Sequence, residues 1–235
     1  MRTYKLGEAD RIIVLLTADH GQIRAVAKGV RRASSKFGSS LEPFMHSRMQ
    51  IIRGRNLDIV SQTQLLHSYG STVAADYDSY GAASAMVETA ERLTTADVDA
   101  SAAAPQFRLL HGALASLSRA EHAPRIILNS YILRALSTAG WAPSFTVCSR
   151  CGKEGPHRSV NIGVGGVVCD DCRPSGSQTP APESIQLLAA LLAGDWATAD
   201  ASDVSHQKEA ASVVERYLQF HVEKNLRSLS VMDQT

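Results

Sequence analysis

The chain lacks any long apolar run that is free of charge. Five charged residues interrupt positions 1–15, so the N-terminal segment does not have the form of a secretory signal. No window approaches the apolar length of a transmembrane helix. The sequence therefore predicts a cytoplasmic protein, and its 44% apolar residues are enough for the core of one large domain or two modest ones.

The chain also lacks the short motifs of common enzyme classes. It contains no phosphate-binding G-x-x-x-x-G-K-[ST] loop, no G-x-S-x-G nucleophile elbow and no H-E-x-x-H zinc-protease motif. Apart from His157, the histidines are scattered, and a lone histidine such as His111 or His221 is more often packed or solvated than catalytic. We therefore expect no enzymatic activity and assign no catalytic residue.

Cysteine is scarce, and all four residues lie between positions 148 and 172. They form two C-x-x-C pairs, Cys148 with Cys151 and Cys169 with Cys172, separated by 17 residues. Two such turns satisfy the tetrahedral preference of Zn²⁺, and four thiolates leave no coordination position open. The spacing predicts one structural zinc ion, contributing on the order of 10 kcal/mol to the local fold. Residues 159–168 would form a hairpin that carries the second pair back to the first.

Two alternatives stay open for these cysteines. The expected compartment disfavours a disulfide or redox pair, as does the lack of a strand–helix–strand pattern around either pair. His157 lies between the pairs and could replace one thiol as a ligand. A zinc deaminase does not fit, because the only H-x-E tripeptide, at 221–223, follows both pairs, and a valine instead of a proline stands directly before each pair.

Positive charge is concentrated near the N-terminus, although the net charge of the chain is only +1. Residues 1–60 contain eleven Lys or Arg against five Asp or Glu, whereas residues 174–235 contain four against eight. A positive surface of this kind is typical of proteins that bind polyanions. The cysteine segment would not contribute, because four thiolates and one dication bring residues 148–173 to a net charge of −1.

The sequence predicts an α+β fold, because its periodicity changes from that of strands to that of helices. Strands are expected at residues 11–16, 22–28, 44–52 and 57–66, which suggests a small barrel within a domain of residues 1–72. A helical domain of residues 73–235 follows, with a zinc-binding insert at 146–174.

The helices of this domain are predicted from apolar spacing and from prolines and glycines. The first carries Tyr80, Ala83, Val87 and Ala90 on its apolar face. Pro105 and Pro124 begin the next two, and the helix that begins at Pro124 is apolar on every side and ends at Gly140. After a linker at 173–182, Pro182 to Gly194 forms a helix, and a last one carries Val214, Leu218, Val222 and Leu226.

The densest positive segment is the second expected strand with the loop behind it. No acidic residue lies between Arg24 and Glu42. The cations of this segment are Arg24, Lys28, Arg31, Arg32 and Lys36. On a barrel, such a strand and loop would follow a phosphate backbone, and Phe37 could stack on a base. Alternatively, Phe37 covers the end of the barrel and the cations are only solvated. We favour nucleic-acid binding, on charge and fold signature.

The segment YKLGEADRIIVLLTADHGQIRAVAKGVRRASSKFG resembles the N-terminal module of the RecO family of bacterial recombinational DNA repair proteins. AGWAP, CSRCG and CDDC resemble the helix end and the four-cysteine insert of the zinc-bearing members of that family. The similarity runs over nearly the whole chain and is most specific in the first forty residues and in the insert.

The resemblance implies an OB-fold barrel followed by a helical domain that carries the zinc insert. It also implies binding of single- and double-stranded DNA, annealing of complementary strands and, with RecR, loading of RecA onto DNA coated by single-strand-binding protein. It places the protein in the cytoplasm, in association with the nucleoid and not with a membrane. DNA contacts would then be made by the five cations and Phe37, with Arg125 and Arg134 of the helical domain as weaker candidates. The alternative is a zinc-stapled protein-interaction adaptor that binds no nucleic acid.

The chain departs from the family pattern at two places. Only Met1, Arg2 and Thr3 precede YKLGEAD, where the family normally has most of a strand, so we expect a short or incomplete first barrel strand. The third helix has three aliphatic residues at 126–128, where many members carry an aromatic residue and an acid. No pocket for the tail of single-strand-binding protein is therefore assigned.

Overall fold

A computed structural model describes residues 1–94 and 100–222 of the chain, and these residues form two compact units. The first unit contains Met1–Arg119, and the second begins at Ala120. Strands dominate the start of the chain and helices the remainder, which confirms the expected α+β class. Leu226, expected in the last helix, lies outside the described residues.

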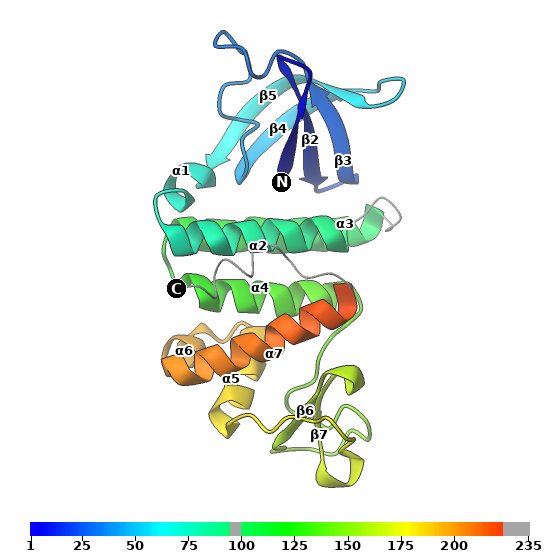
Figure 1. Cartoon of the computed structure of the whole chain (residues 1–235), viewed down its shortest axis with the longest axis vertical. Helices are drawn as coiled ribbons and strands as arrows, with labels where there is room; N and C mark the ends of the chain where they lie inside the picture. Colours follow the sequence, from blue (N-terminus) through cyan, green and yellow to red (C-terminus); the bar gives the residue numbers. More distant parts are fainter. Residues whose placement is uncertain (95–99, 223–235) are drawn as a thin grey trace. The chain divides into compact units, whose positions relative to one another are not determined.

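Five strands form a twisted sheet in the first unit (Figure 1). Their order in the sheet is β1-β2-β3-β5-β4; β3 and β5 run parallel and the other neighbours antiparallel. The strands are β1 (Arg2–Leu6), β2 (Asp10–Thr17), β3 (Gly21–Ala27), β4 (Met45–Ile52) and β5 (Asp58–Ser68). All four expected strands are present, and a five-stranded, partly open barrel is the architecture of an OB-fold.

The first strand is short, but it pairs along its full length. Arg2 lies opposite Val14 and Leu6 opposite Asp10, so all five residues of β1 are in register with β2. Within residues 1–94, β1 and β4 are the two edges of the sheet. The expected shortening of the first strand therefore does not interrupt its pairing with β2.

The core of the barrel is small and apolar. It contains Ile13, Leu15, Ala25, Ala27 and Val60 from the strands, together with Phe37 and Leu41 from the loop between β3 and β4. Phe37 is only 4% exposed. Its ring belongs to the core and is not at the surface, where a base could stack on it. The structure thus corrects the assignment of Phe37 to a nucleic-acid contact and favours the alternative, in which this ring fills the barrel.

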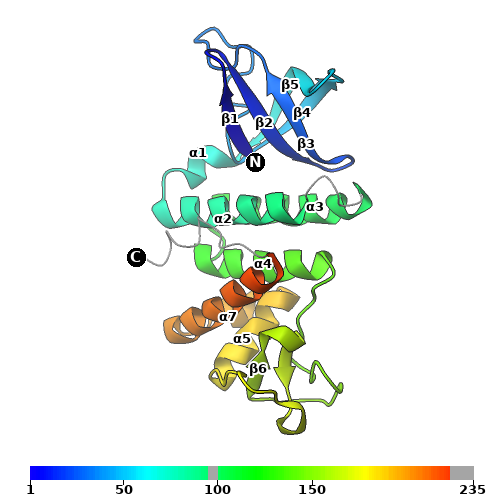
Figure 2. The same ribbon diagram turned by 45° about the vertical axis from the view of Figure 1, so that its right-hand side comes forward.

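Three helices complete the first unit: α1 (Tyr69–Val73), α2 (Tyr77–Leu93) and α3 (Ala100–Ser118). Helices α2 and α3 pack against each other, and α3 also contacts β2 and β3, so the pair lies across one end of the barrel (Figure 2). The compact unit therefore extends past the expected boundary between residues 72 and 73, because these helices bury apolar surface against the strands. The division into domains of residues 1–72 and 73–235 stays a prediction.

Two details of these helices differ from the expected ones. Helix α3 begins at Ala100 and contains Pro105 in its interior, because the preceding alanines have the highest helix propensity and extend the helix backwards. Tyr80 is 51% exposed, whereas Ala83, Val87 and Ala90 are buried. The apolar face of α2 is therefore narrower than the spacing suggested.

The second unit is a helical bundle with a small insert. Its helices are α4 (Pro124–Thr138), α5 (Pro182–Ala193), α6 (Trp196–Asp200) and α7 (Val204–Val222). Ten of the fifteen residues of α4 are buried, as expected for a helix that is apolar on every side, and α4 packs against α5 and α7. Gly140 follows α4 and Gly194 caps α5 with left-handed backbone angles, so both helices end where the glycines predicted.

The insert is a two-stranded hairpin with one short helical turn between its strands and another after them. Its elements are β6 (Ser159–Asn161), η1 (Ile162–Val164), β7 (Gly166–Val168) and η2 (Asp170–Cys172), which confirms the expected hairpin. The segment 173–182 is more than a linker, because the backbone groups of Gln178 exchange hydrogen bonds of 2.8 and 2.9 Å with those of Val160. This segment therefore extends the insert beside β6.

No helix in the part of the chain that the structure describes combines the length and hydrophobicity needed to cross a bilayer.

Candidate metal centre and nucleic-acid interface

The cysteines lie on two tight turns of similar form. In the first turn, the amide of Gly152 donates to the carbonyl of Cys148, and the amide of Cys148 donates to the carbonyl of Lys153, both at 2.8 Å. In the second turn, at the end of β7, the amide of Cys172 donates to the carbonyl of Cys169 at 3.1 Å. Each turn thus directs two thiols toward the same side of the backbone.

The hairpin brings the two turns together. The amide of Ser149 donates to the carbonyl of Val167 at 2.8 Å, and Gly166 lies against Ser144. A Cβ on Gly166 would come within 2.0 Å of the Ser144 oxygen, so only glycine permits this approach. The strand β7 therefore lies directly beside the first cysteine turn.

The four sulfur atoms form a compact cluster, all within 4.8 Å of one another. The Sγ atoms of Cys151 and Cys169 are 3.8 Å apart. A zinc ion with four sulfurs at roughly 2.3 Å in a tetrahedron would place them about 3.8 Å from each other. All four cysteines are free thiols in this structure, which argues against a disulfide. The cluster could hold a metal ion, and four soft sulfur donors suit Zn²⁺.

His157 does not take part in the cluster. Its Nε2 atom donates a hydrogen bond to the carbonyl of Lys153 at 2.8 Å, and the metal-binding group contains only the cysteines. The alternative in which His157 replaces a thiol is therefore not supported by the geometry.

The electrostatics of the cluster favour a cation. The amide of Cys169 donates to Sγ of Cys148 at 3.4 Å, which lowers the pKa of the Cys148 thiol to about 6. The thiol of Cys172 donates to the sulfurs of Cys169 and Cys151, and this raises its pKa to about 12. Because negative charges this close repel one another, all four groups become thiolates together only when a dication compensates them.

The basic residues lie on the other compact unit, on β3 and the loop of residues 28–44. Arg24, Lys28, Arg31, Arg32 and Lys36 are all exposed. None of the five forms an ion pair with a carboxylate among residues 1–94 and 100–222. By contrast, Arg2 pairs with Glu91 at 3.0 Å and Arg11 with Glu42 at 2.9 Å. The five predicted cations thus retain their full positive charge at the surface.

Two of these cations also hold the loop in place. The guanidinium of Arg31 donates to the carbonyls of Gly7 at 3.3 Å and Glu8 at 2.9 Å. The ammonium of Lys36 donates to the carbonyl of Ser61 at 2.7 Å. A carbonyl oxygen accepts a hydrogen bond without neutralising the charge, so both residues position the loop and still add to its positive field.

Sequence reasoning missed an aromatic side chain on this surface. Tyr4 of β1 is 39% exposed, and Cζ of Arg24 lies 6.0 Å from the centre of its ring. The pairing of β1, β2 and β3 brings these two residues together, although twenty positions separate them in the sequence. From the sequence alone, Tyr4 is only a weak signal of a nucleic-acid contact, because an aromatic residue in a barrel strand can face either the core or the solvent.

The two weaker candidates belong to the second unit. Arg125 and Arg134 both lie on α4 and are half-buried. The guanidinium of Arg134 lies beside Gly194, so that a Cβ there would be 3.6 Å from its Nη1 atom. Their assignment to DNA contacts stays a prediction.

Comparison with known proteins covers both units. The family model described as Recombination protein O N terminal matches residues 1–69, and the one described as Recombination protein O C terminal matches residues 74–230. Similar curated relatives, each named DNA repair protein RecO, occur in Streptomyces griseus, Nocardioides sp. and Thermobifida fusca.

These relatives match over almost their entire length. The identities are 48% over 239 residues, 49% over 236 and 47% over 233, in the same order. Each alignment covers 99% of this chain, and 96%, 96% and 95% of the respective relatives. With two family models and full-length relatives in agreement, the chain belongs to the RecO family of bacterial DNA repair and recombination proteins.

Proposed function

We propose that this protein is a recombination mediator that binds single- and double-stranded DNA and anneals complementary strands. Together with RecR, it would help to load RecA onto DNA coated by single-strand-binding protein, so that RecA is an indirect partner. The observation that carries this proposal is the group of five exposed cations without carboxylate partners, on the barrel of a RecO-family chain.

The arrangement of these cations suits a phosphate backbone. Arg24 extends from β3, and Lys28, Arg31, Arg32 and Lys36 follow on the anchored loop, so successive phosphates can be neutralised along one path. Contacts to phosphate fix the position of a strand without reading its bases. A strand held in this way keeps its base edges free to pair, which annealing requires.

No bond is made or broken in this activity. The protein contributes binding energy, since bringing two polyanions together costs electrostatic repulsion that the cations offset. Tyr4 supports the same role, because an exposed ring beside Arg24 can stack on an unpaired base.

The four cysteines would hold one structural Zn²⁺. All four coordination positions would be filled by protein, so the ion would stabilise the insert and take no part in DNA chemistry. The hairpin of β6 and β7 has only three residues in each strand, too few for independent stability. The metal would therefore supply most of the stability of the insert.

DNA affinity should depend on salt and on the unpaired cations. If about five phosphates of a single strand are neutralised, log K falls with log salt at a slope of about −3.5. Replacing Arg24, Lys28 and Arg32 with glutamine should reduce the slope to about −1.4, without removing the backbone contacts of Arg31 and Lys36. Fluorescence anisotropy of a labelled oligonucleotide at several salt concentrations measures both slopes.

A matched control carries the same charge change on the second unit. The exposed residues Arg173, Lys208 and Arg216 serve this purpose when they are replaced together with glutamine. This control should keep the slope of the wild type. A slope that is flat in the wild type, or equally reduced in both triple variants, contradicts the proposed surface.

Phe37 and Tyr4 should respond in opposite ways to substitution by leucine. Phe37→Leu removes volume from the barrel core and should lower the free energy of unfolding by about 1–2 kcal/mol. DNA affinity of the folded protein should not change, because leucine is also apolar and still anchors the loop in the core. Tyr4→Leu should leave stability nearly unchanged and weaken single-strand binding by about 1–3 kcal/mol. Denaturant unfolding and anisotropy on both variants test this pair, and a loss of affinity confined to Phe37→Leu would reverse the assignment.

Annealing is the direct test of the proposed function. The wild-type protein should accelerate pairing of complementary oligonucleotides, also when one of them is coated with single-strand-binding protein, and the Arg24, Lys28 and Arg32 triple variant should not. Quenching of a fluorophore pair follows the reaction. If the protein neither binds nor anneals DNA but associates with RecR equally well with and without these cations, it is instead a protein-interaction adaptor.

Metal content should depend on the cysteines and not on the neighbouring histidine. Cys148→Ser should contain one equivalent of zinc fewer than the wild type and should unfold at lower temperature, because a Cys₄ site contributes on the order of 10 kcal/mol to its local fold. His157→Ala is the control and should keep its zinc. Elemental analysis and thermal unfolding measure these effects; equal zinc in Cys148→Ser and wild type would exclude the site.

A further inference from the structure

Three histidines converge in the first unit, which corrects the interpretation that the histidines are scattered. His46 lies in β4, His67 in β5 and His111 in α3. One ring nitrogen from each residue lies within 4.8 Å of those of the other two. These residues are 21 and 44 positions apart in the sequence, so no local spacing indicates that they meet.

Strand pairing places the first two rings together. His46 lies opposite His67 in the antiparallel pair of β4 and β5. Their rings stack with centres 5.2 Å apart and planes at 5°, and the two Nδ1 atoms are separated by 3.0 Å. Only one of these two atoms can carry a hydrogen that points to the other, so the second presents its lone pair.

Helix α3 supplies the third ring. The ring of His111 meets that of His46 nearly edge-on, with centres 4.5 Å apart. Its Nε2 atom is 3.1 Å from the hydroxyl of Tyr69, the first residue of α1. This contact orients the imidazole in the way that outer hydrogen bonds hold metal-binding histidines.

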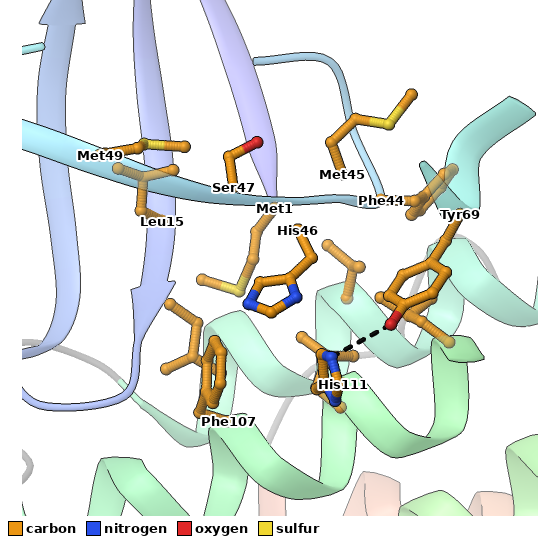
Figure 3. Close-up of a pocket in the computed structure, with 14 residues that line it drawn as sticks. Met1, Leu15, Phe44, Met45, His46, Ser47, Met49, Tyr69, Phe107 and His111 are labelled. Atoms are coloured by element: carbon orange, nitrogen blue, oxygen red, sulfur yellow. Dashed lines mark hydrogen bonds between the residues drawn. The ribbon is translucent and has the colours of Figure 1, made fainter. Parts of the chain in front are cut away.

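The surroundings offer few other polar groups. His46 and His111 line a cavity of about 90 Å³, and Figure 3 shows both rings with Tyr69 among apolar side chains such as Met1, Leu15 and Phe107. None of the described residues that line this cavity is an acid. Among the described side chains that line the cavity, the imidazoles of His46 and His111 are therefore the strongest metal ligands.

We propose that His46, His67 and His111 bind one divalent transition-metal ion, with Zn²⁺ as the natural occupant. Imidazole is a preferred ligand of zinc and of its neighbours in the first transition row. Nitrogens at 2.0–2.1 Å from a tetrahedral zinc lie about 3.4 Å apart. The nitrogen separations here, 3.0 Å for His46 and His67 and at most 4.8 Å for the others, reach that value with small ring rotations.

This site differs in chemistry from the cysteine cluster. Three protein ligands leave one coordination position for water or another small ligand, whereas four thiolates leave none. The ion would also connect three elements, because its ligands come from β4, β5 and α3. Metal binding would therefore stabilise the packing of α3 against the β4–β5 pair, independently of the insert in the second unit.

Cobalt distinguishes the two sites, because cobalt bound to thiolates has an intense charge-transfer absorption that imidazole ligands do not produce. Titration of Co²⁺ into the full-length wild-type protein, after dialysis against a chelator, should show one bound equivalent without thiolate bands. His67→Asn, at an exposed position, should lower the affinity for this cobalt ion by more than roughly 100-fold. Tyr69→Phe should lower it by roughly 10- to 100-fold. Equilibrium dialysis with absorption spectra measures binding, and Zn²⁺ should raise the melting temperature of the wild type more than that of His67→Asn.

His20→Asn is the matched control, since His20 is an exposed histidine of the same unit outside the cluster. It should bind this cobalt equivalent as tightly as the wild type. Two results would exclude the site: every cobalt ion bound by the wild type shows thiolate bands, or His67→Asn and His20→Asn bind this cobalt equivalent equally well. The three rings would then be a stacked and hydrogen-bonded cluster only. His46→Asn replaces His67→Asn if circular dichroism shows that the latter does not fold.

Discussion

The burial of Phe37 and Leu41 in the barrel is the contact on which the basic surface depends. The loop of residues 28–44 carries four of the five predicted DNA-binding cations, and a loop of this length without anchors would hold them in many positions. The two apolar side chains fix its far half in the barrel core. The near half is held where the carboxylate of Asp10 accepts from the amide of Gly29 at 2.7 Å. A surface ordered before DNA arrives loses less conformational entropy on binding.

The same loop shows how charge and structure are combined. Arg31 and Lys36 donate to backbone carbonyls of the β1–β2 turn and of β5, which orders the loop while their charges remain uncompensated. Five like charges on neighbouring positions repel one another, and the hydrogen bonds and the buried ring hold them against that repulsion. A polyanion would reduce this repulsion by neutralising the charges.

The two groups of potential metal ligands illustrate different routes to a site. In the insert, each C-x-x-C turn places two sulfurs together within four residues, and one short hairpin joins the turns. In the first unit, the histidines meet only after β4 has paired with β5 and α3 has packed nearby. The first group depends on local backbone geometry, and the second depends on the completed fold of the unit.

The sequence by itself determined the features that follow from local spacing. Apolar runs, alternation and turn residues predicted β2 to β5, glycines and prolines marked the ends of α4 and α5, and the paired cysteines indicated their own cluster. Local rules failed at two places. The alanines before Pro105 extend α3 past the proline that was expected to begin it, and residues 173–182 are not only a linker, because Gln178 pairs with Val160. Only the tertiary structure decided that Phe37 lies in the core while Tyr4 lies outside, and that three distant histidines converge. The physical reason is that burial and long-range contact depend on which strands and helices pack together, and no periodicity within a single element records that choice.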